Sequence, residues 1–434
     1  ISMKNSAMVA GLILCMVSYA EDNTFDKYGG YTGIKGKTSG FFHVGKINNR
    51  WWYITPEGHA FFPLSVSCMT RLANDGVDRN GKDHMFYIMK KNKKEDGKGF
   101  EWVERWGKDT MNRLRSWGFN TIGTFSWDIQ AYHVLPYTVT LRLSNYAVIK
   151  EGPCGNIWDG IGGGAFPDIY NPDYMNFIDE RMKSFAKKAA KDIFSTLPKD
   201  DDAKETKPEE AYINDSWVID LFPDQMDELR GFDGGHGHLG LAALIGNKEI
   251  SRANKTKVKN YFKDEIIKFL KTKYGDNVTK LNEAWGVNFA NYEAIYDQGP
   301  SNFKDINSVK PVIKADLDSF EEKIAYDYAV SIKNVVRKYD KNHILLSPNM
   351  GAPKENVVKG FLRADAFDVY ACGWSGEYYD RIKKPFLGGS VGLLSADNDS
   401  PLRFEGYVDK CEMVENNKYI KCWDFSGDFW WTMK

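Results

Sequence analysis

The sequence predicts an α/β protein, a single (β/α)8 barrel with an N-terminal β-hairpin in front of its first strand. Eight short runs of the 434-residue chain are apolar on both faces, as strands of a parallel sheet buried on both sides are. Segments with helical periodicity separate most of these runs, and eight such units over about 370 residues suit a barrel. The alternative is an open doubly wound sheet, which the absence of G-x-G-x-x-G after the first run disfavours.

The predicted hairpin spans Gly40–Phe62, where apolar and polar residues alternate around Asn48-Asn49 and the Pro56-Glu57-Gly58 turn, and we expect it to cap one barrel end. The expected strands are Phe61–Cys68, Thr121–Ser126, Thr138–Leu143, Trp217–Phe222, Ile344–Ser347, Phe367–Ala371, Phe386–Val391 and Ile420–Phe425. The expected helices are Trp102–Trp117, Tyr174–Phe194, Lys257–Tyr274, Asp318–Tyr339 and Glu405–Asn416. A barrel normally ends on a helix, so the sequence predicts either truncation after strand eight or a different closure.

The composition limits the function classes. Lys and Arg number 58 and Asp and Glu number 59, for a net charge of −1, so a generic nucleic-acid-binding surface is not expected. Hydrophobic residues make up 42%, enough for a sizeable core. Aromatic residues reach 14%, which suits stacking on sugar rings and suits a large core equally well.

The N-terminus has the pattern of a secretory signal peptide. Lys4 precedes an apolar run from Ala7 to Val17, and Ser18-Tyr19-Ala20 forms a small-x-small ending. We therefore expect residues 1–20 to be a signal peptide and residues 21–434 to be the mature, secreted barrel. The alternative is a membrane anchor, but the run is shorter than the ~20 residues that span a bilayer. No membrane partner is expected.

Cysteine usage fits an exported protein. Five cysteines remain after cleavage, so at least one stays unpaired, and both a Cys411–Cys422 bridge and buried free thiols are open. No Cys or Cys/His spacing typical of a metal site is present, and we expect no cofactor. Four N-x-S/T triplets predict a glycoprotein; they begin at Asn214, Asn254, Asn277 and Asn398.

Several segments, in this order, resemble clan A retaining glycoside hydrolases, especially the group that contains agarases and β-galactosidases. They are NNRWWYITPEGHAFFPLSVSC (Asn48–Cys68), LRSWGFNTIGTFSW (Leu114–Trp127), FLKTKYGDNVTKLNEAWGVNF (Phe269–Phe289) and YDKNHILLSPNM (Tyr339–Met350). The resemblance covers roughly residues 40 to 425. It implies a secreted glycoside hydrolase that acts on a β-linked polysaccharide or oligosaccharide.

The chain departs from that family at the two catalytic positions. The family carries an Asn-Glu pair after strand four, with Glu as acid/base, and a nucleophilic Glu after strand seven. Here those positions fall on Gln225-Met226 and near Ser390. The departures keep two other readings open: a catalytically inactive carbohydrate-binding barrel, and a structural extracellular glycoprotein.

Hydrolysis by paired carboxyls requires two such groups roughly 5 Å or 6.5–9.5 Å apart. In a barrel they lie at the carboxyl ends of the strands. Asp224, Asp227 and Glu228 follow strand four and are the acid/base candidates; the alternative is that they cap and open a short helix. Glu377 and Asp399 follow strands six and seven and are the candidate partners, although a solvated loop and a helix cap explain them equally well.

The substrate-binding candidates lie at the same strand ends. Aromatic rings there could stack on sugars, and polar side chains could bind hydroxyl groups. His236 and His238 in the glycine-rich loop suit a hydrogen bond better than a metal. Nothing in the sequence predicts an oligomeric state, the sugar or the linkage. The complete set of substrate-binding candidates is Trp127, Asp128, His236, His238, Trp374, Tyr378, Trp423 and Asp424.

Overall fold

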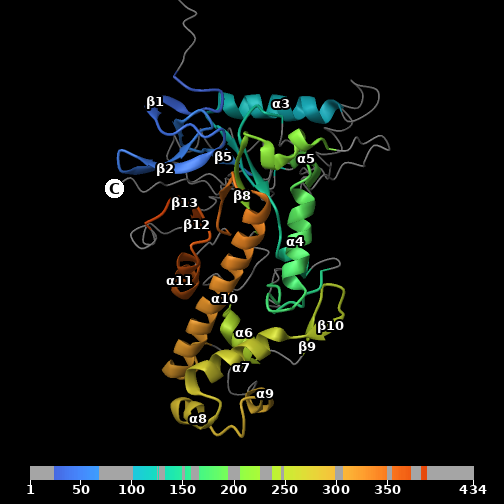
Figure 1. Ribbon diagram of the computed structural model, residues 1–434, viewed down its shortest axis with the longest axis vertical. Helices are drawn as coiled ribbons and strands as arrows, with labels where there is room; N and C mark the ends of the chain where they lie inside the picture. The colour runs from blue at the N-terminus through green and yellow to red at the C-terminus, as the bar shows by residue number, and fades with distance from the viewer. Residues whose placement is uncertain are drawn as a thin grey trace, which may run out of the picture.

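The structure of the chain is a computed structural model. It describes residues 24–67, 101–124, 126, 132–148, 152–157, 166–193, 206–224, 237–245, 249–298, 306–348, 354–372 and 383–388. In these residues the chain combines an antiparallel sheet, a parallel sheet with flanking helices, and a helical region at the opposite end of the molecule (Figure 1). No helix among them is both long and apolar enough to cross a membrane.

The N-terminal antiparallel sheet contains the predicted hairpin. Strands β2 (His43–Ile47) and β3 (Arg50–Ile54) pair in a register that leaves Asn48 and Asn49 as a two-residue loop. Both asparagines have positive φ angles, 51° and 62°, as a type I′ turn requires. Strands β4 (His59–Phe61) and β1 (Tyr31–Lys35) complete the order β1-β4-β3-β2. The predicted hairpin is confirmed.

Seven of the eight expected strands are found, all in parallel pairings between neighbours in chain order. A bridge from Leu346 to Val369 joins the five-stranded sheet to the last two strands. The eighth expected strand, Ile420–Phe425, lies outside the described residues, and the described strands do not by themselves form a closed barrel. The parallel strands are β5 (Ser65–Val66), β6 (Thr121–Ile122), β7 (Tyr137–Thr140), β8 (Val218–Phe222), β11 (Ile344–Leu345), β12 (Tyr370–Cys372) and β13 (Phe386–Gly388).

Helices near the parallel sheet largely follow the expected positions. Helix α3 (Glu101–Ser116) matches its prediction, and α10 (Pro311–Tyr339) begins earlier than expected, with Pro311 in its first turn. The single helix expected over 174–194 is instead α4 (Tyr174–Phe185) and α5 (Ala190–Ile193). At the interruption the N–H groups of Lys187 and Lys188 bond to carbonyls only three residues back, and the Lys188 carbonyl accepts the N–H of Tyr212.

Other helices were not predicted, and one was placed too early. Residues 257–259 form strand β10, so α7 starts only at Tyr261. The expected helix Glu405–Asn416 lies outside the described residues. The elements that the sequence did not predict are β1, α6 (Leu239–Ile245), β9 (Glu249–Ser251), β10 (Lys257–Lys259), α8 (Thr279–Trp285), α9 (Ala294–Gln298), α11 (Glu355–Ala364) and the short 3-10 helices Asn145–Ala147, Pro208–Glu210 and Tyr212–Asn214.

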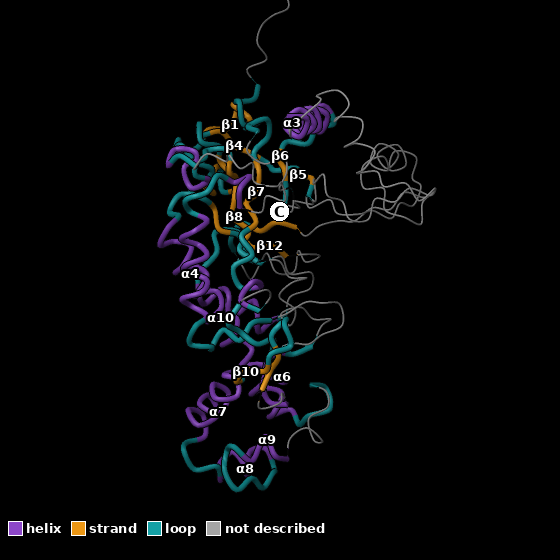
Figure 2. The backbone as a smooth tube through the Cα atoms, turned by 90° about the vertical axis from the view of Figure 1, so that its right-hand side faces the viewer, coloured by secondary structure: helices purple, strands orange, loops and turns teal. Residues whose placement is uncertain are grey.

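The long helix α10 connects the two ends of the molecule. Its 29 residues extend about 44 Å, from the region of α7, α8 and α9 to the parallel sheet (Figures 1 and 2). We call residues 249–298 the helical lobe. Since α10 leads into β11 at its carboxyl end, it runs antiparallel to the strands. The helical lobe therefore lies beyond the carboxyl ends of the strands, on the side where a barrel enzyme carries its site.

The antiparallel sheet covers the opposite end of the strands. Phe42, Tyr53 and Phe61 belong to one buried cluster with Ile344 and Leu346 of the β11 segment. The Tyr53 hydroxyl also donates to Asp220 in β8, at 3.1 Å. The hairpin thus caps the amino ends of the parallel strands; the sequence predicted a cap at one end without saying which.

Candidate functional site

Asp224 and His238 are the predicted site residues that the structure describes. They come from the segments on either side of the loop that follows β8, and both side chains are buried. The remaining predicted site residues lie outside the described residues. These are Trp127, Asp128, Asp227, Glu228, His236, Trp374, Glu377, Tyr378, Asp399, Trp423 and Asp424.

The Asp224 carboxylate joins three elements at the carboxyl end of the sheet. Its Oδ1 accepts the backbone N–H groups of Ser144 and Asn145, at 2.8 and 3.2 Å, in the turn that follows β7. Its Oδ2 accepts the Tyr328 hydroxyl of α10, at 2.9 Å. The Asp224 side chain is 0% exposed. The carboxylate therefore fixes the chain just after β8 to the turn that follows β7 and to α10.

Buried hydroxyl groups extend this network. Ser144 Oγ lies 2.8 Å from the Tyr174 hydroxyl, which lies 3.5 Å from Ser331 Oγ. Burial raises the pKa of Asp224 to about 6, although its hydrogen-bond donors act in the opposite direction. Burial also raises the pKa of Tyr328 far above its usual range, so its hydroxyl stays a proton donor. Of this network, the sequence indicated only Asp224.

His238 immediately precedes α6 in the chain. Its Nδ1 accepts the N–H of Leu241 at 3.2 Å, so in the neutral ring the proton sits on Nε2. Nε2 donates to Asp318 at 2.9 Å and lies 3.4 Å from Glu321. The sequence predicted a sugar hydroxyl as the partner of His238. In the structure the ring is 4% exposed and both its nitrogens contact the chain.

Glu321 is the centre of this second cluster, and the sequence reasoning missed it. Its carboxylate accepts the N–H of Leu239 at 2.7 Å, the ammonium of Lys354 at 2.9 Å and the Asn356 amide at 2.6 Å. It is 0% exposed. A signal was available, because Glu321 interrupts the helically spaced apolar face of α10. Through Glu321, α10 fixes the first residues of both α6 and α11.

Asp168 attaches the helical lobe to the rest of the protein. Its Oδ2 accepts the N–H of Tyr261 at 2.6 Å, so it caps the first turn of α7 from 93 residues away. The Asn260 side chain at the N-cap makes no capping bond of its own. Burial raises the pKa of Asp168 to about 7, above its ordinary 3.8.

These buried acids predict a pH dependence of stability. Asp168, Asp220 and Asp224 have folded pKa values of about 7, 6 and 6, each above the ordinary 3.8. Between about pH 4 and 7 the folded chain therefore binds more protons than the unfolded chain, and the free energy of unfolding falls as pH rises. We expect denaturant unfolding to require more urea at pH 5 than at pH 7.5. Asp168→Asn should reduce the difference, and an unchanged difference would refute the assignment.

One group among the described residues brings possible metal ligands together. Ligand atoms of Asp26, Glu57 and His59 lie within 4.8 Å of one another. Asp26 Oδ2 accepts the Thr55 hydroxyl at 2.5 Å and lies 2.8 Å from His59 Nδ1, and its Oδ1 accepts two backbone N–H groups. These hydrogen bonds explain the arrangement: Asp26 stabilises the turns of the N-terminal sheet.

No family model matches the chain. It is 21% identical over 379 residues to β-agarase B of Vibrio sp. (strain JT0107), covering 75% of this chain and 35% of that protein. It superposes on an exo-β-agarase with a TM-score of 0.61 and 16% identity, covering 89% of this chain and 57% of that one. It superposes on the protein PfGH50B with a TM-score of 0.63 and 17% identity, covering 92% of this chain and 60% of that one.

The chain therefore spans about a third of the curated relative and less than two thirds of these solved structures. It shares their fold, and the expected resemblance to glycoside hydrolases is confirmed. The expected α/β class is confirmed as well.

Proposed function

We propose that the chain is a glycoside hydrolase that acts on a β-linked polysaccharide. The observation that carries this proposal is the fold it shares with an exo-β-agarase, together with the sequence similarity to β-agarase B. Agarose is accordingly the first substrate to test. We further propose that the seven parallel strands belong to a (β/α)8 barrel, closed by Ile420–Phe425 between β13 and β5.

We place the proton donor at Asp227 or Glu228. Both follow Asp224, whose buried carboxylate fixes the start of their loop beside the end of β7. Asp224 already accepts three hydrogen bonds from the chain and acts in this proposal as a positioning residue. The second carboxyl group comes from Glu377 or Asp399, on the loops after β12 and β13.

The chemistry follows from two carboxyl groups on either side of the glycosidic bond. One donates a proton to the leaving oxygen while the other attacks the sugar or activates a water. His238 positions the β8 loop through Asp318 and Glu321. Contacts with the sugar are proposed for Trp127, Asp128, His236, Trp374, Tyr378, Trp423 and Asp424.

A catalytically inactive carbohydrate-binding barrel is the second candidate. It is favoured by Gln225-Met226 and Ser390 at the positions where the resembled family carries its catalytic Glu residues. Reducing-sugar release from agarose and other β-linked galactans, measured beside binding to the same polymers, separates the two. Release supports the hydrolase, whereas binding without release supports the inactive barrel. Neither release nor binding on the whole panel would contradict both.

We also propose that the protein is exported and glycosylated. The support is the N-terminal signal-peptide pattern and three described triplets whose asparagines are exposed, at Asn214, Asn254 and Asn277. Protein secreted by a eukaryotic host should begin at or near Glu21 on N-terminal sequencing, and deglycosylation should lower its mass. An intact N-terminus on cell-associated protein would contradict export.

A further inference from the structure

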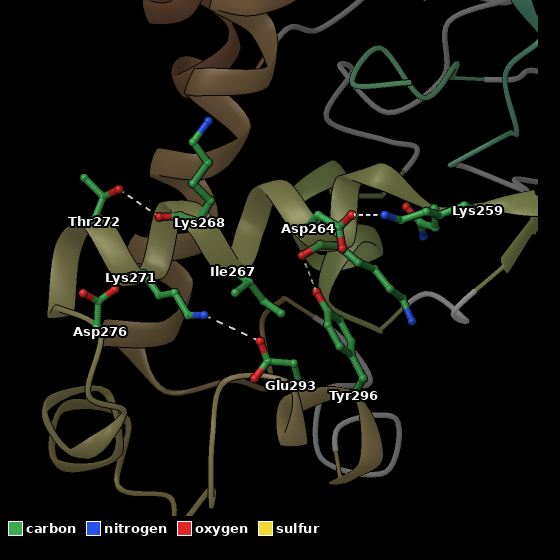
Figure 3. Close-up of a pocket in the computed structure, with 11 residues that line it drawn as sticks. Lys259, Asp264, Ile267, Lys268, Lys271, Thr272, Asp276, Glu293 and Tyr296 are labelled. Carbon is green, nitrogen blue, oxygen red and sulfur yellow. Dashed lines mark hydrogen bonds and ion pairs between the residues drawn. The ribbon is translucent and has the colours of Figure 1, made fainter. Parts of the chain in front are cut away.

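The helical lobe contains a cleft that the proposed hydrolysis does not use. Its volume is about 770 Å³, within the range of roughly 300–1,000 Å³ typical of ligand sites. Figure 3 shows Ile267 and Lys271 on α7 directed toward Glu293 and Tyr296, which come from the segment leading into α9 and from α9.

The charged groups of the cleft compensate one another. Lys271 Nζ lies 3.6 Å from Glu293, and Lys259 Nζ lies 2.5 Å from Asp264. The lining carries four lysines (259, 263, 268 and 271) against three acids (Asp264, Asp276 and Glu293). A nearly balanced set does not select for a polyanion, but it offers hydrogen-bond donors and acceptors side by side.

An aromatic ring and an aliphatic side chain add apolar surface. The Tyr296 hydroxyl donates to the Lys263 carbonyl at 2.8 Å, which holds the ring against α7. The Lys263 ammonium lies 4.2 Å from the centre of the same ring. Ile267 is half-buried beside them. Apolar surface next to paired donors and acceptors matches a sugar, which presents C–H faces and hydroxyl groups together.

The cleft belongs to the helical lobe, whose position bears on which substrate it could bind. The helical lobe projects beyond the carboxyl ends of the parallel strands, where the catalytic loops are proposed (Figures 1 and 2). We propose that this cleft is an accessory binding site for a neutral, hydroxyl-rich polysaccharide chain. This inference rests on the proposed function, because it takes the substrate to be a polymer.

The test compares two variants: one lacks an ion pair of the cleft, and the other lacks an ion pair far from the cleft. The test variant is Lys271→Ala with Glu293→Ala. The control is Lys108→Ala with Glu104→Ala, an exposed pair on α3 at 2.6 Å. Affinity for soluble agarose polymer and for an agarose hexasaccharide is measured by calorimetry, with a sulfated galactan hexasaccharide as the anionic probe.

We expect the cleft variant to bind the polymer about tenfold more weakly than wild type, because one of two linked contacts is lost. The control should bind like wild type, and hydrolysis of the hexasaccharide should be unchanged. The inference is overturned if the cleft variant binds the polymer as tightly as wild type does. It is also overturned if wild type binds the sulfated hexasaccharide more tightly than the agarose hexasaccharide. If wild type binds through the cleft but releases no sugar, the hydrolase proposal fails while the accessory site stands.

Discussion

Replacing Asp227 by Asn is expected to lower the rate of hydrolysis by about 10²–10⁴-fold, the usual contribution of a general acid. Asn keeps the size of the side chain, but its amide has no acidic proton to transfer to the leaving oxygen. The measurement is kcat on whichever polymer wild type degrades, with thermal melting to show that the fold is retained. Glu228→Gln is the parallel variant, because both residues follow Asp224 on the same loop. Full activity in both variants would move the proton donor to another loop.

Asp224→Asn is the matched control for this prediction. The Asn oxygen still accepts the N–H groups of Ser144 and Asn145, and the Tyr328 hydroxyl can rotate to accept from the amide. If Asp224 is a positioning residue, the Asp224→Asn substitution should lower kcat by less than about tenfold. Loss of the general acid lowers kcat by more than that. Its pH profile should keep the wild-type shape. If Asp224→Asn loses activity while Asp227→Asn keeps full activity, Asp224 is the general acid.

The parallel sheet could be predicted because its strands are short apolar runs with local signals. The hairpin was predictable for the same reason, since Asn48-Asn49 specifies its own turn. Helix α11 has a local signal too, with Val357, Val358 and Phe361 buried at helical spacing. Its ten residues between two strands are easily overlooked in a search for long helices.

Other features depend on contacts that no local pattern contains. Lys257–Lys259 becomes a strand only by pairing with Glu249–Ser251, and α7 is capped by Asp168 from far along the chain. In the candidate site, sequence reasoning reached Asp224 because it follows a predicted strand, and His238 because it lies with His236 in a glycine-rich loop. It did not show that their partners are Tyr328, Asp318 and Glu321 on α10. Those partners are what distinguishes a positioning residue from one that contacts substrate.

Glu321→Ala is expected to lower the free energy of unfolding by about 3–5 kcal/mol, the usual effect of removing one partner of a buried ion pair. The substitution removes the acceptor that the ammonium of Lys354, the amide of Asn356 and the N–H of Leu239 share, and Lys354 and Asn356 keep their bonds to backbone carbonyls. The adjacent Glu322→Ala is the matched control. Glu322 pairs with Arg363 at 2.6 Å on a more exposed surface, and such pairs contribute about 0–1 kcal/mol.

Urea denaturation of the two variants measures this difference. Because Glu321 fixes the start of α6 and of α11, we also expect amide hydrogen exchange to increase at Leu239 and its neighbours before global unfolding. The amide of Tyr261, which Asp168 caps at the start of α7, should stay protected. If Glu321→Ala and Glu322→Ala cost the same free energy of unfolding, the buried carboxylate does not anchor the starts of α6 and α11. The positioning role of His238, which depends on the same carboxylate, would then fail with it.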